Sequence, residues 1–339
     1  MIKFPVLRYF VFIFLLCGFS AQAVARVTAD QLAVVVNTAD KNSRLIAQYY
    51  REKRGIPEQN IIEVRFPASG NALSEKDFNR VYRQVEKQAP DTVQYYALAW
   101  SKPFKVGCMS ITSAFAFGFD KRFCAKGCKA TRRSAYYNSD SEKPKDELKV
   151  VPTMMLAGSS LQQIYAMIDR GVAADFTQPE ATAYLMNTSD KARNVRSRRY
   201  PVIQQLLSEN INIDQVDGDV LKGRKDVMFY FTGLTKVKAI ESNRYLPGAI
   251  ADHLTSSGGN LFGFRQMSIL RWLDAGVTAS YGTVVEPCAF TQKFPNPGIV
   301  IERYTEGESL IQAYWKSVAW PGQGVFVGEP MASPYATKQ

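Results

Sequence analysis

Two side chains with complementary chemistry fall in the segment Tyr245–Pro297. His253 is the only histidine in the chain, and Cys288 follows it 35 residues later. A cysteine hydrolase needs a thiolate nucleophile, a histidine base within hydrogen-bond reach and donors for the oxyanion. The pair therefore forms a candidate catalytic dyad of a peptidase-like hydrolase, in which Cys288 would be the nucleophile and His253 the base.

The cysteines admit a second interpretation. Of the five in the chain, Cys17 lies in an apolar N-terminal stretch, and four remain as candidates for disulfides: Cys108, Cys124, Cys128 and Cys288. Four cysteines allow three pairings, and the sequence does not choose among them. A Cys288 in a disulfide would carry no thiol. The C-x₃-C spacing of Cys124 and Cys128 favours a disulfide over zinc, because the single histidine lies far along the chain.

Other chemistries leave no pattern in the chain. A nucleophile elbow of the G-x-S-x-G type does not occur, which disfavours a serine hydrolase of the α/β type. A phosphate-binding P-loop and a G-x-G-x-x-G turn do not occur either, which disfavours a nucleotide enzyme. We expect no cofactor and no bound metal.

The first 25 residues have the order of a secretory signal. Lys3 and Arg8 precede or flank an apolar run, residues 9–19, and overlapping A-x-A sites follow at residues 21–25. The run is shorter than the roughly 20 residues that cross a bilayer. We therefore expect a signal peptide at 1–25, an exported protein in the periplasm or outside the cell, and no transmembrane segment once the signal is removed. Disulfides fit that oxidising compartment.

The chain is basic, with 42 Lys and Arg against 31 Asp and Glu. Six of these bases are clustered with two tyrosines in the segment 121–137. Net positive charge favours weak association with anionic neighbours but does not define a site. The sequence does not identify the binding partner, and the candidates are a peptide and an anionic envelope polymer. No pattern indicates binding to a specific nucleic acid.

Alternating apolar segments predict the elements that would position these residues. Buried strands are expected at 31–37, 61–66 and 93–100, with amphipathic helices between them, and again at 226–232, 277–281 and 324–327. This order favours a mostly parallel sheet with helices on both faces. We expect a single large α/β domain over 26–339, with a cysteine-bearing insertion at about 102–150.

The same reasoning places the histidine on a helix. Pro247 suits a first helical position, Ile250 and Leu254 would share one face, and Gly258-Gly259 would end the helix. A catalytic base is more often found at a strand end or in a loop. The run from Arg193 to Arg199 is expected to be an exposed linker, and Asn260–Phe264 a short strand.

Several segments resemble a family of secreted bacterial proteins of unknown function. They are LAVVVNTAD, IAQYYREKRGIPEQNI, CMSITSAFAFGF, LPGAIADHLTSSGG, AGVTASYGTVVEPC with KFPNP, and SLIQAYWKSVAWPGQGVFVGEP. The resemblance covers most of the mature chain and implies no established activity.

The order of elements is also distantly similar to the caspase-like fold of gingipain-type cysteine peptidases. Their closing Gly-Asp-Pro corresponds to Gly328-Glu329-Pro330. Where they carry His-Gly after a strand, this chain has Thr232-Gly233, and where their cysteine follows the next strand it has the cysteine-free run Thr255–Gly259. The resemblance implies a caspase-like scaffold without the family's dyad.

Two functions follow from these patterns. The first is an exported, non-catalytic caspase-like scaffold protein of the cell envelope with a binding role. The alternative is a cysteine hydrolase that uses Cys288 and His253.

Overall fold

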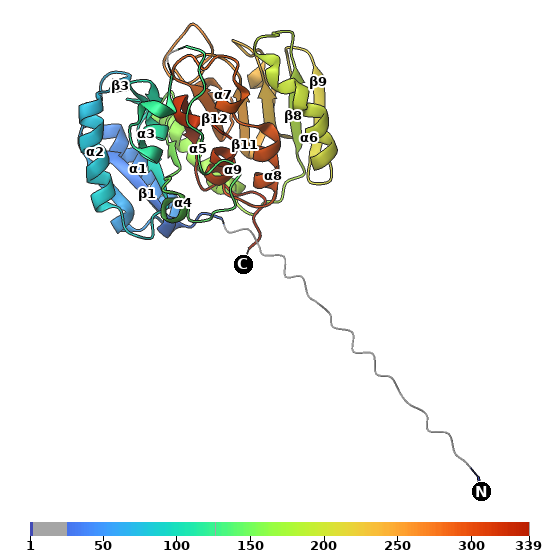
Figure 1. Cartoon of the computed structure of the whole chain (residues 1–339), viewed down its shortest axis with the longest axis horizontal. Coiled ribbons are helices and arrows are strands. Elements are labelled where there is room, and N and C mark those ends of the chain that lie inside the picture. Colours follow the sequence, from blue (N-terminus) through green and yellow to red (C-terminus); the bar gives the residue numbers. More distant parts are fainter. Residues whose placement is uncertain (3–25, 126, 339) are drawn as a thin grey trace.

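A ten-stranded sheet crosses the molecule (Figure 1). The computed structural model describes residues 1–2, 26–125 and 127–338. The signal peptide expected at 1–25 falls almost wholly on residues 3–25, outside the described residues. The strands lie in the order β2 (Ile61–Val64), β1 (Leu32–Asn37), β4 (Tyr95–Leu98), β7 (Thr153–Met155), β13 (Gly324–Gly328), β12 (Ala279–Thr283), β11 (Tyr245–His253), β10 (Val227–Thr232), β8 (Thr182–Asn187) and β9 (Asn212–Asp217).

The sheet consists mostly of two sets of parallel strands. The strands from β2 to β7 pair in parallel with their neighbours, and so do the strands from β12 to β9. Strand β13 lies between the two sets and runs antiparallel to β12. The carboxyl ends of both sets lie at the same edge of the sheet, where Phe104 after β4 packs against Phe262 after β11. The predicted mostly parallel α/β architecture is confirmed.

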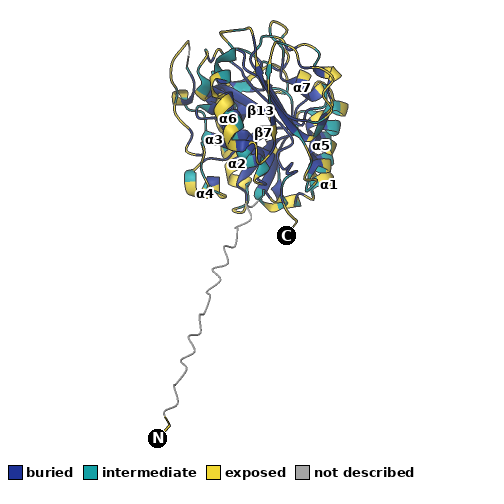
Figure 2. Ribbon diagram, turned by 90° about the vertical axis from the view of Figure 1, so that its right-hand side faces the viewer, coloured by how far each residue is buried: buried dark blue, intermediate teal, exposed yellow. Residues whose placement is uncertain are grey.

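Helices cover both faces of the sheet (Figure 2). The set α1, α5 and α7 lies on one face, and α2, α3 and α6 lie on the other. The helices are α1 (Lys41–Arg54), α2 (Glu75–Gln88), α3 (Ile111–Phe117), α4 (Pro144–Leu148), α5 (Leu161–Ala174), α6 (Tyr200–Leu207), α7 (Leu270–Asp274), α8 (Pro297–Thr305) and α9 (Leu310–Lys316). Because both faces are covered, every residue of β1 and β10 is buried, as continuous apolar strands require.

Local signals explain the first helices. The Asp40 carboxylate accepts a hydrogen bond from the Asn42 N–H at the start of α1, and Gly55 ends this helix with a φ of 64°. At α2, the Ser74 hydroxyl accepts from the Asp77 N–H. Both capping side chains are of the types preferred at helix N-termini.

Residues 102–150 connect the neighbouring parallel strands β4 and β7. Within them β5 (Lys105–Val106) and β6 (Met109–Ser110) form a small sheet with β3 (Ala72–Leu73). Helix α3 is buried against β7 and β13. Two disulfides fasten the segment: Cys108–Cys124 within it, and Cys128–Cys288 to the loop after β12.

The predicted helix from Pro247 is wrong, because Tyr245–His253 is strand β11. Its register to β10 shifts between Val227 and Phe229, whose partners are Tyr245 and Ile250. Pro247 and Gly248, the latter with a φ of 87°, fall in the extra length, so the proline stays out of the ladder. Short apolar runs of small residues carry no period that separates a buried strand from a helix.

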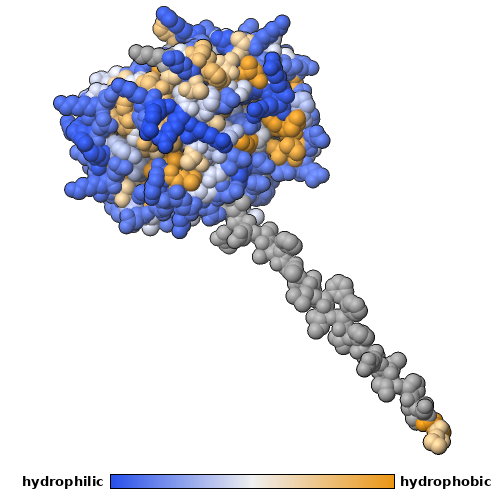
Figure 3. Space-filling model, in the orientation of Figure 1, coloured by the Kyte–Doolittle hydropathy of each residue, from blue (hydrophilic) through white to orange (hydrophobic). Residues whose placement is uncertain are grey.

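The surface shown in Figure 3 is largely hydrophilic, with limited apolar patches. One apolar patch lies over α6, where Val202 and Leu206 are exposed. Among the residues that the structure describes, no helix combines the length and apolarity needed to cross a membrane.

Candidate functional site

His253 ends β11, directly beside the last residue of β10. Thr232 and His253 are partners in the parallel register of these strands. Carboxyl ends of parallel strands are where α/β folds bind ligands. The structure therefore puts the only imidazole at the edge where a site is expected, although on a strand rather than a helix.

Both ring nitrogens of His253 are occupied. The Trp272 indole N–H donates to Nδ1 at 3.0 Å, and Nε2 lies 3.0 Å from the Met267 carbonyl oxygen. Since an indole only donates and a carbonyl only accepts, the ring is neutral with its proton on Nε2. The side chain is 1% exposed. Burial lowers the pKa of His253 to about 4, and the positive Arg196 acts in the same direction.

Cys288 lies in the loop after β12, and its sulfur is bonded to Cys128. The backbone of Cys288 is left-handed, with a φ of 55°, and its N–H donates to the Glu286 carboxylate at 2.7 Å. Glu286 thereby anchors this loop. The two members of the candidate dyad thus have separate partners: a disulfide for the cysteine, and Trp272 and Met267 for the histidine.

Asp252, the residue before His253, forms a buried ion pair with Arg196. Arg196 donates to the Asp252 carboxylate at 2.6 Å and to the Thr232 carbonyl oxygen at 2.7 Å. Arg196 lies in the 3₁₀ helix Asn194–Arg199, which the sequence predicted to be an exposed linker; that prediction is wrong for Arg196, which is 3% exposed. Its carboxylate partner is distant in sequence, so a basic run could not signal its burial.

The segment before this 3₁₀ helix fills the crevice above β10. A Cβ at Gly233 would lie 2.1 Å from the Arg193 carbonyl oxygen. The Thr188 hydroxyl donates to the Gly233 carbonyl oxygen, and Arg193 donates to the Thr255 hydroxyl at 3.2 Å. Protein atoms therefore occupy the space directly over Thr232-Gly233.

An open hollow of about 650 Å³ lies nearby, beside α7. This helix lies on the right-hand face of the sheet in Figure 2. The walls of the hollow come from the segment after β10, the loop after β11, and α7. The predicted strand Asn260–Phe264 is wrong, because these residues are part of that loop. Aliphatic side chains form the floor: Val237, Leu261, Met267 and Leu270. The volume falls in the range of ligand pockets.

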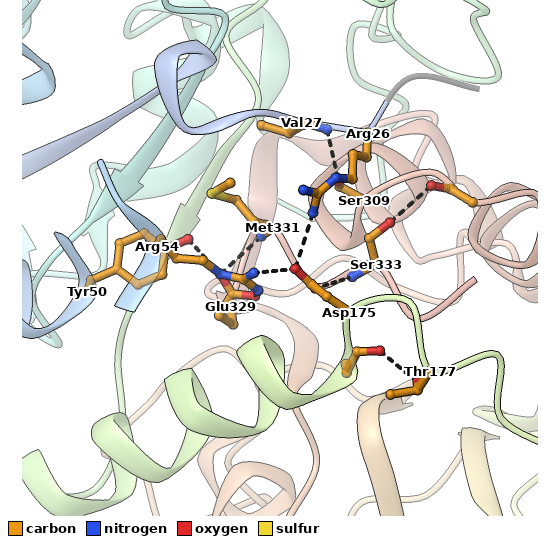
Figure 4. Close-up of polar contacts among 12 residues, drawn as sticks. Arg26, Val27, Tyr50, Arg54, Asp175, Thr177, Ser309, Glu329, Met331 and Ser333 are labelled. Atoms are coloured by element: carbon orange, nitrogen blue, oxygen red, sulfur yellow. Dashed lines mark hydrogen bonds and ion pairs between the residues drawn. The ribbon is translucent and has the colours of Figure 1, made fainter. Parts of the chain in front are cut away.

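The opposite edge of the sheet carries a second polar cluster, at the closing Gly328-Glu329-Pro330 (Figure 4). Arg54 binds both carboxylate oxygens of Glu329, at 3.0 and 2.5 Å, and reaches Asp175 at 2.6 Å. The Tyr50 hydroxyl donates to Glu329 at 2.6 Å, and Arg26 contacts Asp175 at 3.2 Å. With every charge of the cluster paired, it joins the segment before β1 and the end of α1 to the segment after β13.

Two comparisons of sequence find no counterpart, since no protein-family model and no curated protein matches the chain. Among solved structures, the chain is similar to one described as "Structure of Protease", at 9% identity with a TM-score of 0.51, over 92% of this chain and 80% of the other. It also aligns with the complex of the pro- and mature domains of RgpB from Porphyromonas gingivalis, at 11% identity with a TM-score of 0.49, over 89% of this chain and 79% of the other.

At these identities the similarity is one of fold alone. We base the similarity of fold on the protease structure, because the gingipain alignment has a TM-score below 0.5. The distant likeness to a peptidase fold that the sequence indicated is therefore supported as a likeness of scaffold. Activity does not follow from a shared scaffold.

Proposed function

We propose that the chain is an exported, non-catalytic protein of the cell envelope that uses a peptidase-like scaffold for binding. The observation that carries this proposal is the state of His253. A general base must present a lone pair to the proton it removes. The Nδ1 lone pair of His253 accepts from Trp272, and Nε2 carries the proton donated to Met267.

The sulfur chemistry supports the same function. The nucleophile of a cysteine hydrolase is a thiolate, and a sulfur in a disulfide is not one. Cys288 is bonded to Cys128. The Arg193 carbonyl also fills the position over Gly233, so no space remains there for a substrate.

Export is supported by the signal-like residues 1–25 and by the two disulfides, which persist in oxidising compartments. The alternative, a hydrolase using Cys288 and His253, requires the Cys128–Cys288 bond to open and His253 to leave Trp272. Nothing in the described contacts favours either step.

Thiol reactivity after mild reduction tests the proposal. Cys288 released from its disulfide should react with iodoacetamide no faster than an exposed model thiol at neutral pH, and His253→Gln should leave that rate unchanged. A rate well above the model thiol that falls in His253→Gln would contradict the proposal, because it would reveal an imidazole-activated thiolate.

A further inference from the structure

We infer that the hollow beside α7 binds a peptide in which acidic residues flank an aromatic or aliphatic side chain. This inference rests on the binding role proposed above and specifies its ligand. The first observation is an unusual exposure of aromatic rings. Phe262 is 41% exposed and Phe264 is 86% exposed, and both line the hollow. Large apolar side chains gathered on a rim mark interaction sites.

The rim of the hollow is positively charged. Lys236 and Lys238 are exposed on it, and among the described residues neither forms an ion pair at contact distance. Hydrogen bonds from a serine lower the pKa of Asp219, and the charge of Lys238 adds to this effect. Lys102 adds a third cation, with its ammonium 4.2 Å from the centre of the Phe262 ring.

One carboxylate, that of Asp274, lines the hollow, and it accepts a hydrogen bond from the Ser159 hydroxyl at 2.6 Å. Arg271, also in the lining, is paired with Glu241. Among the described residues neither carboxylate pairs with a lysine of the rim, so the lysines remain available for carboxylates of a ligand. Complementary charge of this kind steers encounter and selects among partners.

Hydrogen bonds to Gln266 and Met267 fix the loop that carries the two phenylalanines. The Gln266 amide oxygen accepts from the Ser257 N–H at 2.7 Å and from the Thr255 hydroxyl at 2.9 Å. His253 holds the Met267 carbonyl, and the Met267 N–H donates to Thr235 at 2.9 Å. His253 is thus a positioning residue for one wall of the hollow, and a preformed wall reduces the entropy lost on binding.

A peptide fits these features better than other anions do. The aliphatic floor needs an apolar side chain to fill it, which a polysaccharide or a phosphate backbone does not provide. A lipid surface is flat, whereas here the apolar atoms line a hollow of about 650 Å³. An extended peptide offers apolar and acidic side chains on alternate residues.

The test uses the mature protein and a labelled eight-residue peptide that alternates aspartate with phenylalanine and leucine. Fluorescence anisotropy near physiological salt should give a dissociation constant on the order of 10–100 µM. Replacing the aspartates by lysine, or the apolar residues by serine, should weaken binding at least about tenfold, or about 1.4 kcal/mol.

Matched variants locate the site. The double variant Lys236→Glu and Lys238→Glu should weaken binding at least about tenfold, whereas Lys76→Glu and Lys87→Glu, also exposed but on α2 across the sheet, should leave it within about twofold. Phe264→Ser should weaken binding at least about fivefold, while Leu206→Ser, 71% exposed on α6, should not.

Three outcomes would overturn the inference: no peptide binding at millimolar concentration, equal binding of the serine-substituted peptide, or retention only on phosphatidylglycerol vesicles. Mass spectrometry of the recovered peptide separates this inference from the proposed function. An intact peptide whose binding is weakened by the variants of the hollow supports both the inference and the proposed function. A cleaved peptide whose binding is weakened by the same variants supports the inference but contradicts the proposal that the protein is non-catalytic.

Discussion

At the scale of single residues, the environment of His253 determines what its imidazole can do. Desolvation disfavours the charged ring, and among the described residues no carboxylate forms a hydrogen bond with it. The nearby Arg196 adds repulsion. Its two hydrogen bonds select one neutral tautomer. The residue therefore stabilises the fold when neutral and opposes it when protonated.

This state predicts a pH dependence of stability. The pKa of His253 is about 4 in the folded protein, against about 6.5 for a histidine in an unfolded chain, so the unfolded chain binds the extra proton first as pH falls. Its contribution is complete above pH 6.5 and is lost between pH 6.5 and 4. Between pH 7 and 5 the free energy of unfolding should fall by about 2 kcal/mol.

Urea unfolding at both pH values measures this change. His253→Gln provides the control, since it keeps a hydrogen-bonding side chain that does not titrate. The difference between pH 7 and 5 should be smaller in the variant by about 2 kcal/mol. Equal pH dependence in both proteins would show that His253 is not buried as a neutral ring.

A second prediction at this scale concerns the effect of a side chain at Gly233 on stability. Its missing Cβ admits the Arg193 carbonyl, which would lie 2.1 Å from a methyl group at this position. Gly233→Ala should therefore destabilise the protein by about 3 kcal/mol or more, because backbone must move. Gly298→Ala is the matched control, since its Cβ would meet the flexible Ile203 side chain at 3.2 Å. Thermal unfolding of both variants checks the contrast, and similar midpoints would contradict it.

At the scale of elements, the buried pair of Arg54 on α1 and Glu329 after β13 joins distant parts of the chain. Removing one partner leaves a buried charge, so Glu329→Gln should cost about 3–5 kcal/mol. Both side chains are at most 5% exposed. Glu241→Gln, in the exposed pair with Arg271, should cost less than about 1 kcal/mol. Chemical unfolding gives both values, and equal costs would refute the structural role of the cluster.

The disulfides differ in the length of chain they close. Cys128–Cys288 spans 160 residues and Cys108–Cys124 spans 16. In the chain-entropy model their removal costs about 5 and about 3 kcal/mol. Replacing both cysteines of the longer loop by alanine should thus lower the unfolding midpoint more than the same change in the shorter one. The reverse order would indicate that the loop after β12 is held mainly by other contacts.

Sequence patterns predicted some elements and missed others for identifiable reasons. Strand β1 and helix α1 were predictable, because a continuous β-branched run and a capped amphipathic period are local signals. Strand β11 was not, because Pro247 and Gly248 occupy a bulge that depends on the register with β10. Arg196 was missed for the same kind of reason, since its partner Asp252 lies 56 positions away.

At the scale of the molecule, the antiparallel contact of β12 and β13 separates two edges with different roles. The edge after β13 is closed by the Glu329 cluster. The edge after β11 and β12 carries His253, the loop of Cys288 and the nearby hollow. The sequence indicated this second edge through its histidine and cysteine. It could not indicate the hollow, because its walls combine residues 236–238 with residues 261–274, more than 20 positions further along the chain.

The central claim is that the edge with His253 binds without catalysing, and the state of Cys288 tests it most directly. The mature protein should be alkylated under denaturing, non-reducing conditions and its intact mass measured. We predict no alkylated cysteine, and peptide mapping should recover a Cys128–Cys288 crosslink. A Cys288 that is alkylated in the native protein, at a rate that His253→Gln lowers, would contradict the account.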